Sequence, residues 1–321
     1  MGKKAVLLLA HGTPETIDQI PEYLRNVTSG RPLPPEVVAE IEHRYSLIGR
    51  SPLTEITNVQ AKLVEEELAA SGVPVPVYVG MRNWRPYIPD VVRSMRSDGI
   101  EEAAVICMAP QNSRTSVGLY RRAVEAEAGQ LRIDFTEGWA RHPLLADAFA
   151  ERLRPALRKL SEEAGRPVPV LFTAHSVPVR TVQPPPAGSE AGPRIWPGQG
   201  ADPYAEEARH TAEMVAERVP EIPKWWFAFQ SQGASGGPWI GPSVEETLET
   251  IAAEGYKFLI LQPIGFLCDH VEILFDVDRL FRYHAKRIGV RLERPESLNS
   301  SLTLAKAVAE LARASLRRLE Y

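Results

Sequence analysis

The chain has 321 residues, of which 44% are hydrophobic and 24% are charged, and its formal net charge is −4. These values are typical of a globular protein with two domains of roughly 150 residues. The negative net charge excludes the electrostatic attraction on which nucleic-acid binding depends. No apolar run approaches the ~18 residues of a transmembrane helix.

The cysteine content limits the redox chemistry of the protein. Cys107 and Cys268 cannot build a disulfide framework, nor supply the four ligands of a common iron–sulfur cluster. Both lie in or beside apolar runs, so we expect buried thiols in a protein of the reducing cytoplasm. The apolar run 5–10, after two lysines, is too short for a signal peptide, and we interpret it as a first strand.

Short apolar runs alternate with longer amphipathic segments, a rhythm that predicts βα units and parallel sheets. The predicted strands are 5–10, 75–80, 103–109 and 132–137, then 168–174, 224–229, 258–263 and 290–293. Helical periodicity is strongest over 53–70, 144–160 and 301–319.

These elements predict an α/β protein of two similar Rossmann-like domains, 1–163 and 164–321. Each domain is expected to hold a four-stranded parallel sheet flanked by helices. The last helix, about 301–319, is a candidate to pack back on the first half. The active site is expected in the cleft between the halves.

One motif closes the first strand of each predicted half. Leu8-Leu9-Ala10-His11-Gly12-Thr13-Pro14 has its echo in Phe172-Thr173-Ala174-His175-Ser176-Val177-Pro178. Parallel sheets bind ligands at the carboxyl ends of their strands. His11 and His175 are therefore candidates to bind a metal or to transfer a proton near neutral pH.

The segment 183–202 follows the second motif and is rich in proline and glycine, so we expect no regular structure there. Two interpretations remain open. It is either a tolerated surface insertion or a lid over the site, with Trp196 as a candidate stacking residue.

An acidic segment follows the seventh predicted strand, which ends at Pro263. Asp269 is a candidate helix cap, and Glu272 and Asp276 are spaced i and i+4, on one face of the helix. Two such carboxylates can accept protons or pass on a hard cation. The alternative is a solvated acidic helix face. His270 points away from Glu272 and is expected to pack or to support the site.

At these residues the chain resembles the ferrochelatase family. The resemblance rests on the strand motif ending in His175, on Gln230-Ser231-Gln232-Gly233 with Pro238-Trp239-Ile240-Gly241-Pro242, and on Asp269-His270-Val271-Glu272. It covers nearly the whole chain. It implies a porphyrin held between two Rossmann-like halves, and a lyase reaction that inserts Fe(II) and releases two pyrrole protons in haem biosynthesis.

The resemblance also assigns residues. His175 and Glu272 match the family's catalytic, metal-handling pair, although it does not say which takes the protons, and Asp276 is a possible outer metal station. Four residues match porphyrin-contacting positions of the branch that uses coproporphyrin III: Arg44, Tyr45, Ser51 and Tyr120. Fe(II) is a substrate here, and no prosthetic group is implied.

Two positions depart from that branch. His11 stands where a tyrosine usually ligates the product iron, and imidazole can also serve as axial ligand; the alternative is a histidine that only packs at the strand end. Thr28 stands where an arginine usually binds a propionate, a task that Arg25 or Arg31 could take over.

Other functions remain open at this point. They are a ferrochelatase for protoporphyrin IX, a chelatase for another tetrapyrrole such as sirohydrochlorin with cobalt, and a non-catalytic haem-binding protein. We expect a monomer that uses porphyrin and Fe(II), with enzymes of the haem pathway as possible partners.

Overall fold

The computed structural model describes residues 2–182, 201–233 and 237–320 of the chain. Its strands form two separate sheets, each entirely parallel. The first contains β1 (Lys3–Ala10), β2 (Val77–Met81), β3 (Ile100–Cys107) and β4 (Arg132–Thr136), and the second contains β5 (Val170–His175), β6 (Trp225–Gln230), β7 (Phe258–Pro263) and β8 (Arg291–Glu293). All eight predicted strands are confirmed, with ends displaced by at most three residues.

The two sheets share one topology. The spatial order is β2-β1-β3-β4 in the first and β6-β5-β7-β8 in the second, so each first strand is central. In each sheet, the loop that follows the neighbouring inner strand donates a backbone hydrogen bond to the central first strand. Met108, after β3, donates to Leu9 of β1, and Ile264, after β7, donates to Thr173 of β5. The duplicated α/β fold predicted from the sequence is therefore confirmed. His11 and His175 occupy equivalent strand ends.

The helices cover both faces of each sheet. They are α1 (Ile20–Val27), α2 (Pro35–Ile48), α3 (Leu53–Ala70), α4 (Ile88–Ser97), α5 (Val117–Ala128), α6 (Pro143–Ala164), α7 (Val179–Val182), α8 (Tyr204–Arg218), α9 (Val244–Ala253), α10 (Arg282–Arg287) and α11 (Leu302–Arg318). A short 3-10 turn, η1 (Ile17–Gln19), precedes α1, and a π-helix, η2 (Glu272–Phe281), precedes α10. In the part of the chain that the structure describes, no helix is long and apolar enough to cross a membrane.

Alternation along the strands divides the core. Val6 and Leu8 of β1 point into a core shared by both halves, whereas Leu7 and Leu9 point to the opposite face, under α4 and α5. Phe172 of β5 belongs to the same shared core. The two sheets are thus joined by one continuous apolar interior.

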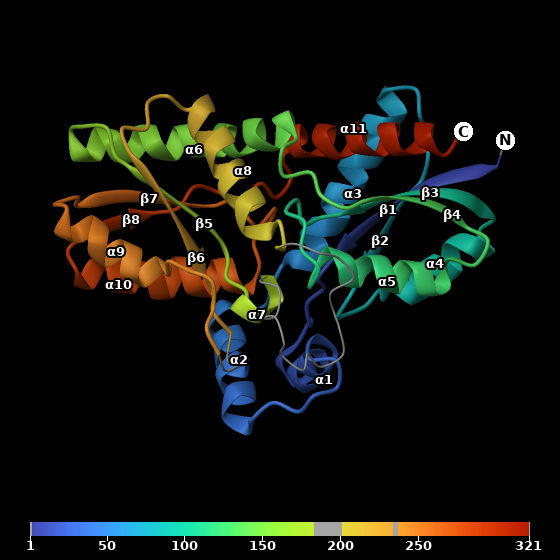
Figure 1. Cartoon of the computed structure of the whole chain (residues 1–321), viewed down its shortest axis with the longest axis horizontal. Coiled ribbons are helices and arrows are strands. Elements are labelled where there is room, and N and C mark those ends of the chain that lie inside the picture. Colours follow the sequence, from blue (N-terminus) through green and yellow to red (C-terminus); the bar gives the residue numbers. More distant parts are fainter. Residues whose placement is uncertain (1, 183–200, 234–236, 321) are drawn as a thin grey trace.

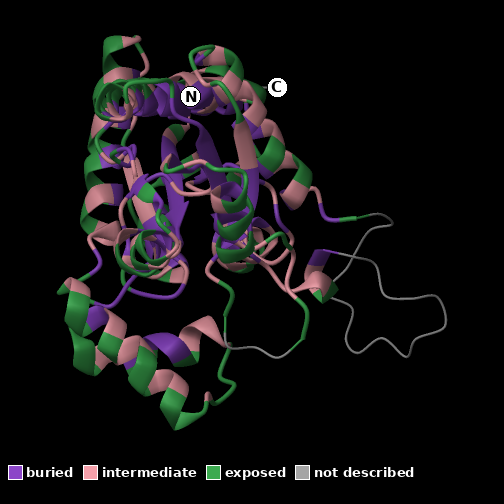
Figure 2. Ribbon diagram, turned by 90° about the vertical axis from the view of Figure 1, so that its left-hand side faces the viewer, coloured by how far each residue is buried: buried purple, intermediate pink, exposed green. Residues whose placement is uncertain are grey.

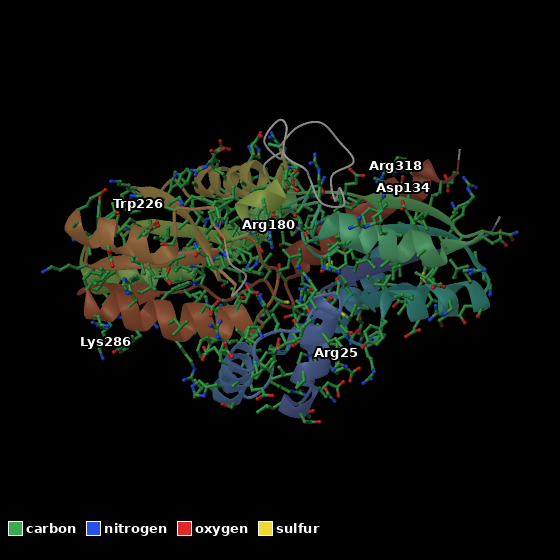
Figure 3. The ribbon with its side chains drawn as sticks, turned by 60° about the horizontal axis from the view of Figure 1, so that its bottom comes forward. Arg25, Asp134, Arg180, Trp226, Lys286 and Arg318 are labelled. Carbon is green, nitrogen blue, oxygen red and sulfur yellow. The ribbon has the colours of Figure 1, made fainter. Side chains whose placement is uncertain are left out.

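The helix that ends each half, α6 in the first and α11 in the second, packs against the sheet of the other half. α6 follows β4 of the first sheet but packs against α8 and β7 of the second. α11 follows β8 of the second sheet but packs against α3, β3 and β4 of the first (Figure 1). Arg318 of α11 reaches Asp134 of β4 at 2.6 Å between Nη2 and Oδ2, and Figure 3 shows the two side chains together. A domain boundary at 163/164 stays a prediction.

Helices α1 and α2 form a small layer of their own. They lie below the two sheets in Figure 1 and present exposed faces in Figure 2. Tyr23 and Leu24 of α1 and Tyr45 of α2 pack against Trp84, which follows β2. This layer closes the space beneath the strand ends.

Candidate active site

A cavity of about 390 Å³ lies between the halves, at the carboxyl ends of β1 and β5. This volume is within the range of small-molecule sites. Its first-half wall includes His11, Tyr23, Tyr45, Ser51, Arg82 and Tyr120, and its second-half wall includes His175, Tyr204, Trp239, Phe266, His270 and Glu272. The cavity therefore contains both strand-end histidines.

His175 and Glu272 are in direct contact. Nδ1 of His175 lies 3.1 Å from Oε2 of Glu272, and 35% and 32% of the two side chains remain exposed. Neither atom makes a well-aligned hydrogen bond to any described residue. Such a pair keeps its bonding capacity available, which suits a site that receives a cation or a proton.

The charges of this pair are coupled. Burial raises the pKa of Glu272, but the contact with His175 brings that pKa down to about 2. Burial lowers the pKa of His175, but the Glu272 and Asp276 carboxylates raise it by more, so its net shift is upward. Glu272 is thus a carboxylate at neutral pH, and His175 is the better proton acceptor of the two.

Glu272 begins a helix, as predicted, but η2 is a π-helix. The i, i+4 spacing still brings Glu272 close enough to affect Asp276, whose pKa rises to about 6 because of burial and the negative charge of Glu272. Ser231 donates a short hydrogen bond to Asp276, and Nη1 of Arg44 lies 3.4 Å from its Oδ1. The buried Asp276 is thus a partnered group and not a solvated face; it forms an acidic wall with Glu272, although only Glu272 lines the cavity.

Asp269 does not cap this helix, so that prediction was wrong. Its carboxylate accepts hydrogen bonds from Oγ of Ser297 at 2.7 Å and Nδ2 of Asn299 at 2.9 Å, and it also contacts Arg294. These three partners draw the carboxylate toward the loop before α11. Asp269 therefore anchors the acidic segment.

His11 has a different environment from His175. Its Nε2 lies 3.0 Å from the Tyr23 hydroxyl, and both ring nitrogens lie within 3.3 Å of Nδ2 of Asn83. Burial, aided by the positive charge of Arg82, lowers the pKa of His11 to about 4. The ring is neutral and held in a hydrogen-bond network.

Gly12 explains why the first motif needs glycine after histidine. Its φ is +83°, and a Cβ there would lie 2.9 Å from the backbone nitrogen of Trp84. The equivalent Ser176 fits in the second half, where its hydroxyl donates to the carbonyl of Ile240. The glycine therefore allows the loop after β2 to approach His11.

The porphyrin-contacting residues implied by the resemblance separate into two groups. Tyr45, Ser51 and Tyr120 line the cavity. Arg44 is not among the lining residues; its guanidinium binds Glu40 and Asp276 and lies over the Phe275 ring. Thr28 is not a lining residue either.

The Thr28 hydroxyl is used within the turn after α1. It donates to the carbonyls of Leu24 and Arg31. Arg25, which could take its place, lies on α1 in the lower layer (Figure 3), and neither it nor Arg31 lines the cavity. The assignment of these residues to the porphyrin stays a prediction.

Sequence reasoning missed Arg82, Tyr23 and Tyr204. Tyr204 donates from its hydroxyl to the carbonyl of His175 at 2.8 Å and so fixes the strand end. Arg82 had a usable signal, because it directly follows β2 at the carboxyl edge of the first sheet. Trp196 and residues 183–200 lie outside the described residues, so the lid hypothesis stays a prediction.

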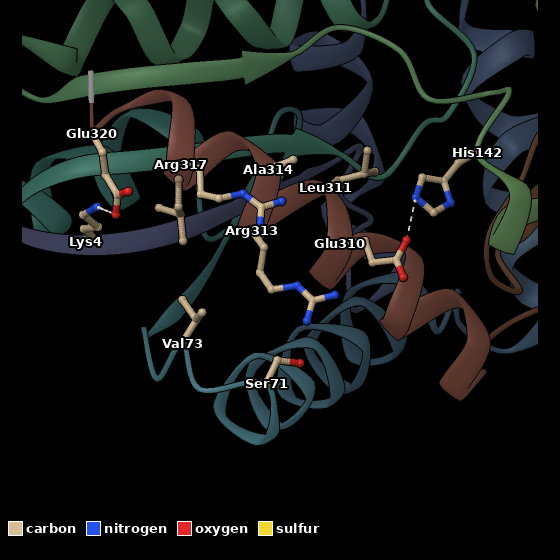
Figure 4. A pocket seen from close by; sticks show the side chains of 11 residues that line it. Lys4, Ser71, Val73, His142, Glu310, Leu311, Arg313, Ala314, Arg317 and Glu320 are labelled. Carbon is tan, nitrogen blue, oxygen red and sulfur yellow. Dashed lines mark hydrogen bonds and ion pairs between the residues drawn. The ribbon is translucent and has the colours of Figure 1, made fainter.

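A second hollow, of about 620 Å³, lies on the outside of the first half. It is lined by α11 and by the chain that follows α3 (Figure 4). Its carboxylates are engaged, since Glu320 contacts Lys4 at 2.8 Å and Glu310 contacts His142 at 3.5 Å. None of the predicted site residues lines it.

The two cysteines are free and buried, as expected.

Known proteins identify the family of this chain. The family model described as Ferrochelatase matches residues 3–316. A ferrochelatase of Acidobacterium capsulatum is 58% identical over 319 residues, which cover 99% of this chain and 96% of the relative. A coproporphyrin III ferrochelatase of Mycolicibacterium vanbaalenii is 34% identical, over 97% and 89% of the two chains.

Solved structures agree on the fold. The sirohydrochlorin chelatase of Bacillus subtilis subspecies spizizenii, solved in complex with cobalt, has a TM-score of 0.57 and 11% identity, and the match covers 99% of this chain and 97% of that one. This likeness supports the two-domain fold alone. The family model and the 58% identical relative show that the chain belongs to the ferrochelatase family, whose enzymes insert a metal into a porphyrin.

Proposed function

We propose that His175 and Glu272 handle Fe(II) and the pyrrole protons in this reaction. The contact of 3.1 Å between an imidazole and a carboxylate, in the wall of the cavity between the halves, carries the proposal. A carboxylate and an imidazole are both ligands of ferrous iron. The reaction replaces two pyrrole protons by one divalent cation, so the site must receive a cation and release two protons.

The roles of the two residues follow from their charges. Glu272 stays ionised because its pKa is about 2, so it attracts the incoming cation. A divalent cation beside this carboxylate cancels the charge that raises the pKa of His175, and the imidazole then releases its proton. Neutral His175 can accept one proton from a pyrrole nitrogen, release it to water and then accept the second, so that both protons leave the site as the cation enters. Asp276, next along the acidic wall, is the outer station for cation or proton.

We favour coproporphyrin III as the porphyrin. Relatives that carry this substrate in their names match nearly the whole chain at 31–34% identity, whereas the 58% identical relative is named ferrochelatase without a stated porphyrin. The cavity wall offers hydroxyl donors from Tyr45, Ser51 and Tyr120. These groups suit carboxylates on the ring edge. The proposed enzyme is a cytoplasmic monomer without a prosthetic group or iron–sulfur cluster.

Anaerobic Fe(II) insertion into coproporphyrin III and protoporphyrin IX, measured side by side, tests this proposal. We expect a higher kcat/KM with coproporphyrin III. Equal or lower values would overturn the substrate assignment. His175→Ala should lower kcat/KM for insertion into both porphyrins by at least about 100-fold. The control is His210→Ala, which removes an imidazole from the surface of α8 and should leave insertion unchanged.

A further inference from the structure

In the part of the chain that the structure describes, Arg82 is a cation of the cavity wall without a counter-ion. It follows β2, and its backbone N–H donates to the carbonyl of Ala10, which fixes it beside the His11 strand end. Its side chain lines the cavity. Among the described residues, its guanidinium makes no hydrogen bond and no ion pair. An arginine that is partly removed from water and unpaired carries a desolvation cost that a bound anion would offset.

No carboxylate of residues 2–182, 201–233 or 237–320 is among the groups that act on Arg82. The charged and titratable groups that act on it are Tyr120, Arg122 and Tyr23, of which Arg122 is a like charge. Burial, with a smaller contribution from Arg122, lowers the pKa of Arg82 from its usual value. Arg44 differs, because it already binds the Glu40 and Asp276 carboxylates. Arg82 is therefore an arginine that is available to a ligand of this cavity.

Tyr120 provides a second donor on the same wall. It is 4% exposed and lines the cavity, and its hydroxyl makes no hydrogen bond within the described residues. Burial raises the pKa of Tyr120 well above its usual value, so the hydroxyl stays protonated and can donate. A guanidinium and a hydroxyl on one wall match the two oxygens of a carboxylate.

We propose that Arg82 is a further recognition residue, which binds a propionate carboxylate of the porphyrin beside Tyr120, a residue that the resemblance already matches to a porphyrin contact. The inference rests on the proposed function, since it takes a carboxylate-bearing porphyrin as the occupant of the cavity. It places one ring edge against the β2 and α5 side of the first half. Arg82 thereby acts in substrate recognition, apart from the His175–Glu272 pair.

Binding measurements test this recognition role without requiring turnover. Titrations followed by porphyrin fluorescence compare coproporphyrin III with its tetramethyl ester, for the wild type and for Arg82→Met. We expect Arg82→Met to weaken binding of the acid by about 10- to 100-fold and to lower the ester-to-acid ratio of Kd values by a similar factor. Tyr120→Phe should weaken binding of the acid by about 3- to 10-fold.

The control is Arg122→Met, which removes the neighbouring but exposed arginine and should leave the ester-to-acid ratio unchanged. Arg82→Lys should retain part of the preference for the acid, because it keeps the charge but not the bidentate geometry. An unchanged ratio in Arg82→Met would overturn the inference, whether or not overall binding weakens. These experiments measure binding, so they separate the two proposals. If Arg82→Met lowers the ester-to-acid ratio as expected but the protein inserts no iron, only the proposed function is overturned.

Discussion

The two walls of the cavity begin from the same motif and end with different chemistry. On the first-half wall, His11 is neutral and hydrogen-bonded to Tyr23 and Asn83. On the second-half wall, His175 faces Glu272 without a well-aligned hydrogen bond. The strand end fixes where each imidazole lies, but the loop packed against it decides what the imidazole can do. Duplication thus supplied two equivalent positions, of which one has an acidic partner.

The largest expected effect comes from breaking the second-half pair. His175→Ala and Glu272→Gln should each lower kcat/KM for Fe(II) insertion by about 10²- to 10⁴-fold, because each removes a group that handles the cation or its protons. Stopped-time assays of metalloporphyrin formation measure this loss. Near-normal insertion by either variant would show that the pair is not the reaction centre.

A smaller effect is expected on the first-half wall. His11→Phe should lower insertion by less than about 10-fold, since His11 is neutral and engaged in hydrogen bonds. We also expect His11 to be the axial ligand of the product iron, so His11→Phe should change the spectrum of the haem complex. The Soret band of the haem complex is the measurement.

Tyr23→Phe is the matched variant for this test, because it removes the hydroxyl that contacts Nε2 of His11 while keeping the aromatic packing on Trp84. The spectrum of its haem complex should be like that of the wild type. Identical Soret bands in the wild type and His11→Phe would remove His11 as the axial ligand. His11 would then be a residue that only packs at the strand end.

The smallest effect concerns stability. The pKa of Asp276 is raised from 3.8 to about 6 in the folded protein. The folded state therefore binds the proton more tightly, and the stability that this contributes is present below pH 3.8 and is lost as the pH rises through about 6. Asp276→Asn escapes this loss. Its free energy of unfolding, relative to that of the wild type, should be about 1–2 kcal/mol larger at pH 7 than at pH 4, so the variant is relatively more stable at pH 7.

Urea denaturation at the two pH values measures this difference. Asp147→Asn serves as a control, because this carboxylate lies at the surface, where Arg218 contacts it, outside the acidic wall. A relative stability of Asp276→Asn that does not change with pH would mean that Asp276 titrates as a solvated carboxylate. The acidic wall would then end at Glu272.

Sequence patterns predicted the fold and part of the site. Apolar runs gave the strands because buried parallel strands are apolar on both faces. The Ala-His repeat placed His11 and His175 because strand ends meet at one edge of a sheet. Arg82 was missed because the sequence does not show whether a single arginine after a strand forms an ion pair with a carboxylate. That information depends on contacts between residues far apart in the chain, as does the hydrogen bond between Tyr23 and His11.

Amphipathic periodicity has the same limit for the long helices. The apolar face of α6 and that of α11 are visible in the sequence, but the pattern does not say which sheet each face covers. The structure shows each helix on the sheet of the other half. A π-helix over Glu272–Phe281 is also hidden in the sequence, since the spacing of its apolar residues fits an α-helix.

The exchange of α6 and α11 has a consequence for biosynthesis. While the chain emerges from the ribosome, the sheet made first lacks one of its covering helices until the last stretch, Leu302–Arg318, has been translated. The α6 helix is translated before the second sheet, against which it packs. Neither half can reach its native packing alone, so maturation of the enzyme is expected to be post-translational and all-or-none.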